Sequence, residues 1–171
     1  VKRLEDPRAK MVISHSAGDE GHEYAQRVRN YAALLGVEVI SAADIVGDDR
    51  ETLPDGRRRY TIRDVYLNAD LITYPSTYEG FGNALLEAFY FRKPVLINRY
   101  SIFTRDIEPK GFKMPVMDGF LTRRVVEEIR QLLENDTRRR EVVDWNYHLA
   151  KRFYSFSALR RSLRTLVTNI T

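Results

Sequence analysis

Two glutamates, Glu79 and Glu87, flank a Gly-x-Gly turn at 80–82 and lie eight positions apart. The turn follows an apolar run, 70–75, that is typical of a buried strand, and a helical stretch, 84–92, comes after it. Because glycine has no Cβ and the first N–H groups of a helix lack partners, this turn can hold an anion closely. The two carboxylates can accept hydrogen bonds from hydroxyl groups. A sugar nucleotide carries an anion and hydroxyl groups together, so the segment predicts a site for that class of ligand.

The order of these groups gives each carboxylate a place along such a ligand. A phosphate at the helix N-terminus gains roughly 0.3–1 kcal/mol from the helix dipole, so a further basic group is expected to help hold it. Glu87 would lie roughly 7 Å into the helix, where a carboxylate can accept two hydrogen bonds from a ribose diol. Glu79 would face the opposite end of a diphosphate, where the sugar sits. The alternatives are that Glu79 caps the turn and that Glu87 is a solvated helix residue.

Strands and helices alternate along the chain, and this pattern predicts the frame that holds the turn. We expect strands at 11–15, 37–40, 70–75, 95–97 and near 114–116. We expect helices at 23–35, 61–68, 84–92, 123–133, 137–153 and 157–168. The pattern predicts the α/β class, with a Rossmann-like parallel sheet flanked by helices and extra C-terminal helices, in one domain over residues 1–171.

The ends of these elements carry signals of their own. Gly36 is placed to stop the first helix. Asp136 is the candidate N-cap of the helix at 137–153, and Ser155 or Ser157 is the candidate for the last helix. The polar segment 44–59 is expected to be a long, mobile loop. The stretch that follows the strand at 95–97, up to Lys113, is expected to be irregular.

Composition narrows the classes of protein that fit. The chain has 171 residues, 43% of them hydrophobic, and a net charge of +4, so it can bury a core and shows no strong basic imbalance. We therefore expect no nucleic-acid partner. No run of 18 apolar residues occurs, so no transmembrane segment is expected. The absence of cysteine excludes disulfides and thiolate metal sites, and it fits a cytoplasmic location.

Several cofactor and metal motifs fail on inspection. The turn lacks the third glycine of the dinucleotide fingerprint, and the zinc-protease pattern that starts at His22 breaks at Gln26. The other histidines, His15 and His148, are isolated, and no Asp-x-Asp pair occurs. We therefore expect no metal and no cofactor, with the sugar nucleotide as a substrate.

The segments 69–76, 79–82, 86–88 and 93–95 together resemble the donor-binding core of the family 4 glycosyltransferases. These are retaining enzymes with two facing Rossmann-like domains, the GT-B architecture. The resemblance continues more weakly to the Phe-Tyr-Ser-Phe run at 153–156. It implies that this chain is the nucleotide-sugar-binding half of a two-domain hexosyltransferase.

The same resemblance implies a role for each residue of the turn. The family's Glu-x₇-Glu signature falls on Glu79 and Glu87. It implies that Glu79 contacts the transferred sugar at the catalytic centre and that Glu87 holds the ribose, while the amides between them contact sugar and phosphate. The implied donor-binding set is Glu79, Gly80, Phe81, Gly82, Asn83 and Glu87.

Two departures from the family pattern affect these expectations. The family's domain opens with a strand and an Arg-Lys clamp on the diphosphate, whereas the strand at 11–15 resembles the family's second strand. We therefore expect the first strand and the clamp to be absent from this chain. Because charged hydrogen bonds are worth about 1.5–3 kcal/mol each, donor binding should be weak. After the strand at 95–97, Arg99 and Arg105 replace a glycine-rich turn and are candidates to reach the ligand.

Three hypotheses remain open from the sequence. The first is a donor-binding domain that acts with an N-terminal acceptor-binding domain of the same full-length protein, and the isolated chain is then expected to be inactive. Exposed apolar residues should mark the face where that partner domain docks. The second is a non-catalytic, Rossmann-like nucleotide-binding or interaction module. The third is a glycosidase in which Glu79 and Glu87 form an acid–nucleophile pair, although a glycosidase has no need of the phosphate-ready turn.

Overall fold

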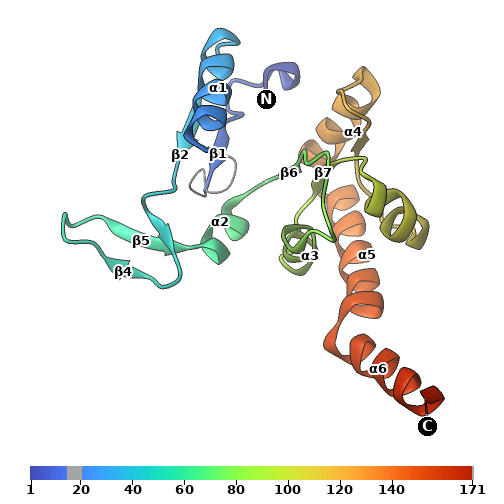
Figure 1. The fold of residues 1–171 in the computed structure, drawn as a ribbon. Coiled ribbons are helices and arrows are strands. Elements are labelled where there is room, and N and C mark those ends of the chain that lie inside the picture. The colour runs from blue at the N-terminus through green and yellow to red at the C-terminus, as the bar shows by residue number, and fades with distance from the viewer. Residues whose placement is uncertain (15–20, 171) are drawn as a thin grey trace. The chain divides into compact units, whose positions relative to one another are not determined.

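The computed structural model describes residues 1–14 and 21–170, and these fall into two compact units, Val1–Asn68 and Ala69–Thr171 (Figure 1). Each unit combines strands with helices. Of the predicted strand at 11–15, residues 11–13 form a strand, and His15 lies outside the described residues. The prediction of one domain stays a prediction, and each unit is described separately below.

The first unit contains a parallel pair of strands and a helix that follows the first of them. Its elements are η1 (Lys2–Leu4), β1 (Met11–Ile13), α1 (Gly21–Leu34), β2 (Val39–Ser41), β3 (Val46–Gly47), β4 (Glu51–Thr52), β5 (Arg58–Thr61) and α2 (Ile62–Asn68). β1 pairs with β2 in parallel, with Met11 opposite Val39. Gly36 takes a φ of 65° just beyond α1, and this left-handed residue ends the helix as predicted.

The expectation of a long loop at 44–59 was wrong. The segment forms a small sheet in the order β3-β5-β4, in which β3 pairs with β5 in parallel and β4 with β5 antiparallel. Arg59 of β5 binds Glu51 of β4 across the strands, and in the turn between them the Arg57 Nε donates to Asp55 at 2.7 Å. The strand pairings join residues that a polar sequence pattern does not connect, and so the sheet was missed.

The second unit is built on a parallel sheet in the order β6-β7-β8. Its elements are β6 (Ile72–Tyr74), α3 (Asn83–Tyr90), β7 (Val95–Asn98), η2 (Phe103–Ile107), η3 (Glu108–Lys110), β8 (Val116–Met117), α4 (Arg123–Glu134), α5 (Asp136–Tyr154) and α6 (Phe156–Ile170). The register sets Ile72 opposite Val95 and Ile97 opposite Val116. All four residues of β7 are buried, as a central strand with covered faces requires.

The core of this unit lies where the helices meet the sheet. α5 packs against both α3 and α4 (Figure 1). Phe89 of α3 is 1% exposed and stacks on Phe112 with ring centroids 4.7 Å apart. The stretch at 98–113, expected to be irregular, instead forms the helical turns η2 and η3, whose Phe103 and Ile107 are buried. That expectation was wrong because the apolar residues of these turns are few and widely spaced.

The caps of the C-terminal helices follow the predictions in part. Asn135 caps α5 by accepting a hydrogen bond from the Arg138 N–H at 2.9 Å, so the assignment of Asp136 was wrong by one residue. Ser155 caps α6, since its Oγ accepts from the Ala158 N–H at 3.2 Å. Both caps are short polar side chains placed just before the helix, as the backbone donors of a first turn demand.

α6 presents an apolar stripe that the described residues leave open. In Figure 1 this helix extends past the sheet toward the C-terminus. Leu159, Leu163, Leu166 and Val167 are all more than half exposed. A groove beside the helix is lined by Phe156, Leu159, Arg160, Leu163, Arg164, Val167 and Thr168. Among the described residues, no helix is long and apolar enough to cross a membrane.

Candidate active site in the β6–α3 turn

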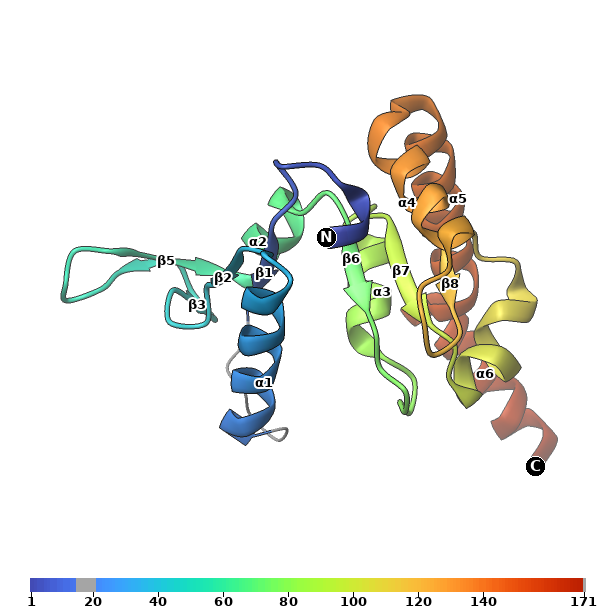
Figure 2. The same cartoon turned by 90° about the horizontal axis from the view of Figure 1, so that it is seen from above.

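The turn between β6 and α3 places the predicted site residues together. Figure 2 shows this connection at the carboxyl end of β6. The helix begins at Asn83, and Gly82 is its N-cap, with a φ of 90°. Because Gly82 has no side chain, the first turn of α3 has no side-chain cap. The helix was predicted over 84–92, so it begins one residue earlier than predicted.

Exposure differs sharply between the predicted site residues. Glu79 and Phe81 are half-buried, and Gly82 is buried. The exposed members of the set are Gly80, Asn83 and Glu87. The loop and the first two turns of α3 therefore present two carboxylates, an uncapped helix start and backbone amides within one short segment.

The fold requires glycine at one position of the turn and not at the other. A Cβ built on Gly82 would lie 2.5 Å from the Tyr74 Oη, and the backbone at Gly82 is left-handed, so the fold itself requires glycine there. A Cβ built on Gly80 would meet no atom within 4 Å, and Gly80 does not have a positive φ. The fold therefore does not require glycine at position 80. The space in front of the loop at this residue is open.

Tyr100 holds the turn from the side of the core. Its hydroxyl donates a hydrogen bond to the carbonyl oxygen of Phe81 at 3.1 Å, and its side chain is 3% exposed. Burial raises the pKa of Tyr100 to about 12, with further contributions from the negative charge of Glu79 and from Tyr154. The hydroxyl therefore stays protonated and remains a donor at physiological pH, and the carboxylate of Glu79 lies near it.

Asn98, the last residue of β7, connects the turn to a second loop. Its Nδ2 donates to the Ser76 carbonyl at 3.2 Å, and its Oδ1 accepts from the Gly119 N–H at 2.9 Å. The side chain is 3% exposed, so both bonds are shielded from water. The loops that follow β6 and β8 are thus held at the same edge of the sheet, where parallel α/β sheets bind ligands.

An aromatic contact joins the turn to the end of α5. The rings of Phe81 and Tyr154 meet edge to face, with centroids 4.8 Å apart. Burial raises the pKa of Tyr154 to about 12, with a smaller contribution from Asp106. Lys110 donates to the Asp106 carbonyl and lies over the Tyr154 ring, 5.5 Å from its centroid. The Phe81 ring is therefore supported by a tyrosine of α5.

The two glutamates of the site are without polar partners in the described part of the chain. Within residues 1–14 and 21–170, neither Glu79 nor Glu87 makes a side-chain hydrogen bond or an ion pair. Other carboxylates of this unit pair with arginines, as Asp136 does with Arg139 at 2.6 Å. Two unpaired carboxylates beside an uncapped helix start are therefore available to a ligand that carries hydroxyl groups and an anion.

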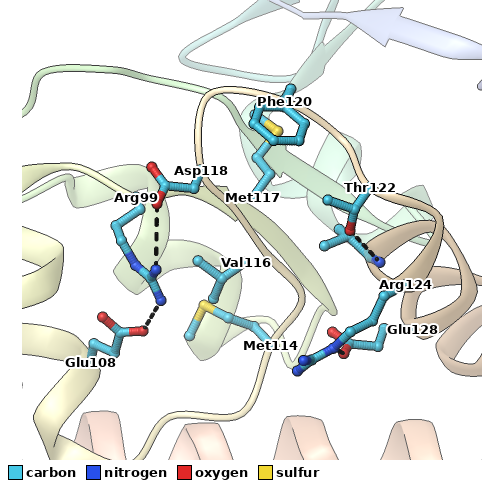
Figure 3. Close-up of a pocket in the computed structure, with 11 residues that line it drawn as sticks. Arg99, Glu108, Met114, Val116, Met117, Asp118, Phe120, Thr122, Arg124 and Glu128 are labelled. Carbon is cyan, nitrogen blue, oxygen red and sulfur yellow. Dashed lines mark hydrogen bonds and ion pairs between the residues drawn. The ribbon is translucent and has the colours of Figure 1, made fainter.

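The two candidate arginines are already engaged. Arg99 binds Glu108 at 2.6 Å and Asp118 at 3.6 Å, as Figure 3 shows, and Arg105 binds Asp106 at 3.2 Å. Arg99 forms part of the wall of a cavity of about 440 Å³ along β8, with Met114 and Val116 among its lining residues. A ligand would have to displace these carboxylates before either guanidinium could bind a diphosphate.

Sequence reasoning missed three residues that support the site. Tyr100, Asn98 and Tyr154 contact the turn from positions that are distant along the chain. One signal was present, since Asn98 and Tyr100 directly follow the apolar strand and carboxyl ends of neighbouring parallel strands meet at one edge. Tyr154 had no such signal. No group of three or more possible metal ligands occurs among the residues described.

Residues 53–147 match the family described as glycosyl transferases group 1, which is more than half of the chain. The matched range contains both glutamates and the whole β6–α3 turn. The chain therefore belongs to this family, and the resemblance noted in the sequence is confirmed.

Two relatives in the same family carry the name mannosylglucosylglycerate synthase. The protein of Thermotoga maritima is 30% identical over 163 residues, which cover 88% of this chain and 36% of the relative. The protein of Petrotoga mobilis is 38% identical over 95 residues, or 56% of this chain and 21% of the relative. This chain thus spans only about a third or less of the length of these relatives.

Solved structures share the fold. Anabaena Alr3699/HepE, crystallised with UDP, superposes with a TM-score of 0.69 over 98% of this chain and 43% of its own, at 17% identity. TarM superposes with a TM-score of 0.62 over 95% of this chain and 30% of its own, at 18% identity. These likenesses confirm the α/β fold class, with parallel sheets and flanking helices, and agree with one half of a GT-B fold.

Proposed function

We propose that this chain is the donor-binding part of a retaining glycosyltransferase and that the β6–α3 turn binds a nucleotide-diphospho-sugar. One observation carries the proposal. Gly82, with its left-handed backbone, begins a helix that has no side-chain cap, and the unpaired carboxylates of Glu79 and Glu87 lie on either side of this helix start in the sequence. Family membership supports it independently. So does the crystallisation of Alr3699/HepE with UDP and with UDP-glucose.

Each site residue has a role in this proposal. Glu87 accepts hydrogen bonds from the ribose diol, and Glu79 accepts them from hydroxyls of the transferred sugar. The amides of Phe81, Gly82 and Asn83 donate to sugar and phosphate, and the α3 dipole favours the negative charge. Open space in front of Gly80 lets the ligand approach the backbone.

The reaction needs no protein base in this scheme. The bond from the sugar C1 to the diphosphate oxygen breaks, and a bond from C1 to the acceptor hydroxyl oxygen forms on the same face. The acceptor proton passes to a β-phosphate oxygen of the leaving diphosphate. The protein contributes by stabilising the charge that develops on this leaving group, and preorganised amides do so without reorganising.

A further domain completes the enzyme. This chain spans 36% of the length of the Thermotoga relative, so the proposed acceptor-binding domain corresponds to sequence outside these residues. The open apolar stripe of α6 supports a docking face for that domain. The mannosylglucosylglycerate synthase relatives support hexosyl transfer. The cytoplasmic location, the independence of metal and the absence of a nucleic-acid partner stay predictions.

A transfer assay tests the proposal on a protein of the relatives' length that contains these residues. UDP-, GDP- and ADP-sugars would be offered with glycosyl acceptors, and the product's anomeric configuration read by NMR. We expect retention of configuration, activity in excess EDTA, and a large loss of turnover in Glu79→Ala and Glu87→Ala. Wild-type turnover in both variants contradicts the assignment of the site.

A further inference from the structure

The backbone N–H of Gly82 makes no hydrogen bond in the described part of the chain. Gly82 itself is buried, while its carbonyl is used, accepting from the Leu85 N–H at 3.1 Å. A backbone N–H with no acceptor inside the protein can donate to water or to a ligand. The Gly82 N–H is therefore available to an acceptor atom that a ligand supplies.

The direction of this N–H follows from the peptide that contains it. In a trans peptide the carbonyl of one residue and the N–H of the next point in opposite directions, and the chain has no cis peptide among its described residues. The Phe81 carbonyl is held inward by the hydroxyl of buried Tyr100 at 3.1 Å. The Gly82 N–H is therefore turned away from Tyr100, toward the open side of the loop.

We propose that Tyr100 is a positioning residue that aims the Gly82 N–H at a phosphate oxygen of the nucleoside diphosphate. This inference rests on the proposed function and adds a residue to it. Tyr100 does not touch the ligand but fixes the rotation of the peptide whose other end does. Without the hydroxyl, the Phe81 carbonyl loses its buried donor and the peptide plane is free to rotate.

Neighbouring contacts hold the two residues that flank this peptide. Tyr74 packs against the α-carbon of Gly82, close enough to exclude a Cβ, and its ring lies 6.3 Å from that of Tyr100. The Phe81 side chain is held by the Tyr154 ring. With both flanking residues fixed, the hydrogen bond from Tyr100 is what selects the orientation of the amide plane between them.

The test uses ¹⁵N-glycine-labelled protein and the nucleoside diphosphate, among UDP, GDP and ADP, that binds most tightly. In the wild type we expect the Gly82 amide proton to move downfield on saturation, because it gains a charged acceptor. Tyr100→Phe should reduce this shift and weaken binding roughly two- to tenfold, the equivalent of one net hydrogen bond. Tyr90→Phe, the same change at an exposed tyrosine of α3, should leave both unchanged.

The outcomes separate this inference from the proposed function. If a nucleotide binds while the Gly82 signal stays unmoved, Tyr100 has no positioning role and the donor site stands without it. An equal effect of Tyr100→Phe and Tyr90→Phe overturns the inference in the same way. Even if Tyr100→Phe does not fold, an unmoved Gly82 signal in the wild type overturns the inference. Absence of binding by all three nucleotides overturns the proposed function and this inference with it.

Discussion

Tyr74 and Gly82 lie in contact across the β6–α3 turn, so closely that a Cβ on Gly82 would stand 2.5 Å from the Tyr74 Oη. Tyr74 ends β6 and Gly82 opens α3, so this contact fixes the width of the turn that connects them. The segment from Tyr74 to Gly82 carries Glu79 and two of the three amides that we assign to the donor, those of Phe81 and Gly82. The close approach of the ring to the glycine therefore shapes the site directly.

This contact predicts that the two glycines of the turn respond differently to alanine. Gly82→Ala should lower the free energy of unfolding by roughly 2–5 kcal/mol, because it adds left-handed strain and a clash with a buried ring. Gly80→Ala should change it by less than about 0.5 kcal/mol, since its Cβ meets open space. Urea denaturation of both variants measures the difference.

The affinity of Gly80→Ala for a nucleotide tests whether the ligand approaches the loop at this residue. Gly80→Ala should weaken binding of a nucleoside diphosphate although the fold is intact, because the new methyl group occupies the space left for the ligand. Unchanged affinity in Gly80→Ala would show that the ligand does not approach the loop at this residue.

Two buried asparagines make a matched pair for testing how the site is supported. Asn98 joins Ser76 to Gly119, whereas Asn146 bonds the N–H and the carbonyl of Lys113 at 2.8 and 2.7 Å. Each replacement by alanine should cost about 1–3 kcal/mol of stability, since each leaves buried backbone groups unpaired. Only Asn98→Ala should also weaken nucleotide binding. Equal losses of affinity in the two variants would show that Asn98 acts only through stability.

Acid should weaken the first unit through Asp64. Asp64 is 8% exposed, and its carboxylate accepts from Arg50 Nε at 2.9 Å and from the Thr61 N–H at 2.9 Å. These bonds, with that of Arg50 first, hold the pKa of Asp64 well below its usual value. Because the unfolded chain then takes up the proton first, the stabilisation is present above about pH 4 and is lost as the pH falls below it.

The Asp64→Asn variant isolates this effect. It should be less stable than the wild type at pH 7, and the difference should shrink between about pH 4 and pH 2, where the wild type loses its advantage. Urea unfolding of both proteins at pH 7 and pH 3 provides the test. Parallel pH profiles would show that another group carries the acid sensitivity.

The turn was predictable from sequence because its signals are local. An apolar strand, two glycines and an amphipathic helix follow one another within about twenty residues, and each depends on backbone rules that act over a few positions. The position of the helix start places Glu79 in the loop before α3 and Glu87 within α3. The strands β6 and β7 and the helices α3 to α6 were found for the same reason.

What sequence could not supply was pairing between distant residues. The sheet formed by β3, β4 and β5 depends on contacts such as Arg59 with Glu51, in a segment whose polar composition is typical of loops. The hydrogen bond from Tyr100 to Phe81 joins residues 19 positions apart. The fold decides such contacts, and a single sequence has no periodic pattern that records them.

The most direct test of the donor site is calorimetric titration of the protein with UDP, GDP and ADP. The same titration would be run on Glu87→Ala and on Glu141→Ala, a control at an exposed glutamate of α5 for which the structure shows no ion pair. We predict that one nucleotide binds the wild type and the Glu141→Ala variant alike. Its affinity should fall in Glu87→Ala by about tenfold or more, as expected when charged hydrogen bonds to the ribose are lost. Equal affinity of that nucleotide for Glu87→Ala and the wild type would contradict the donor site proposed in the β6–α3 turn.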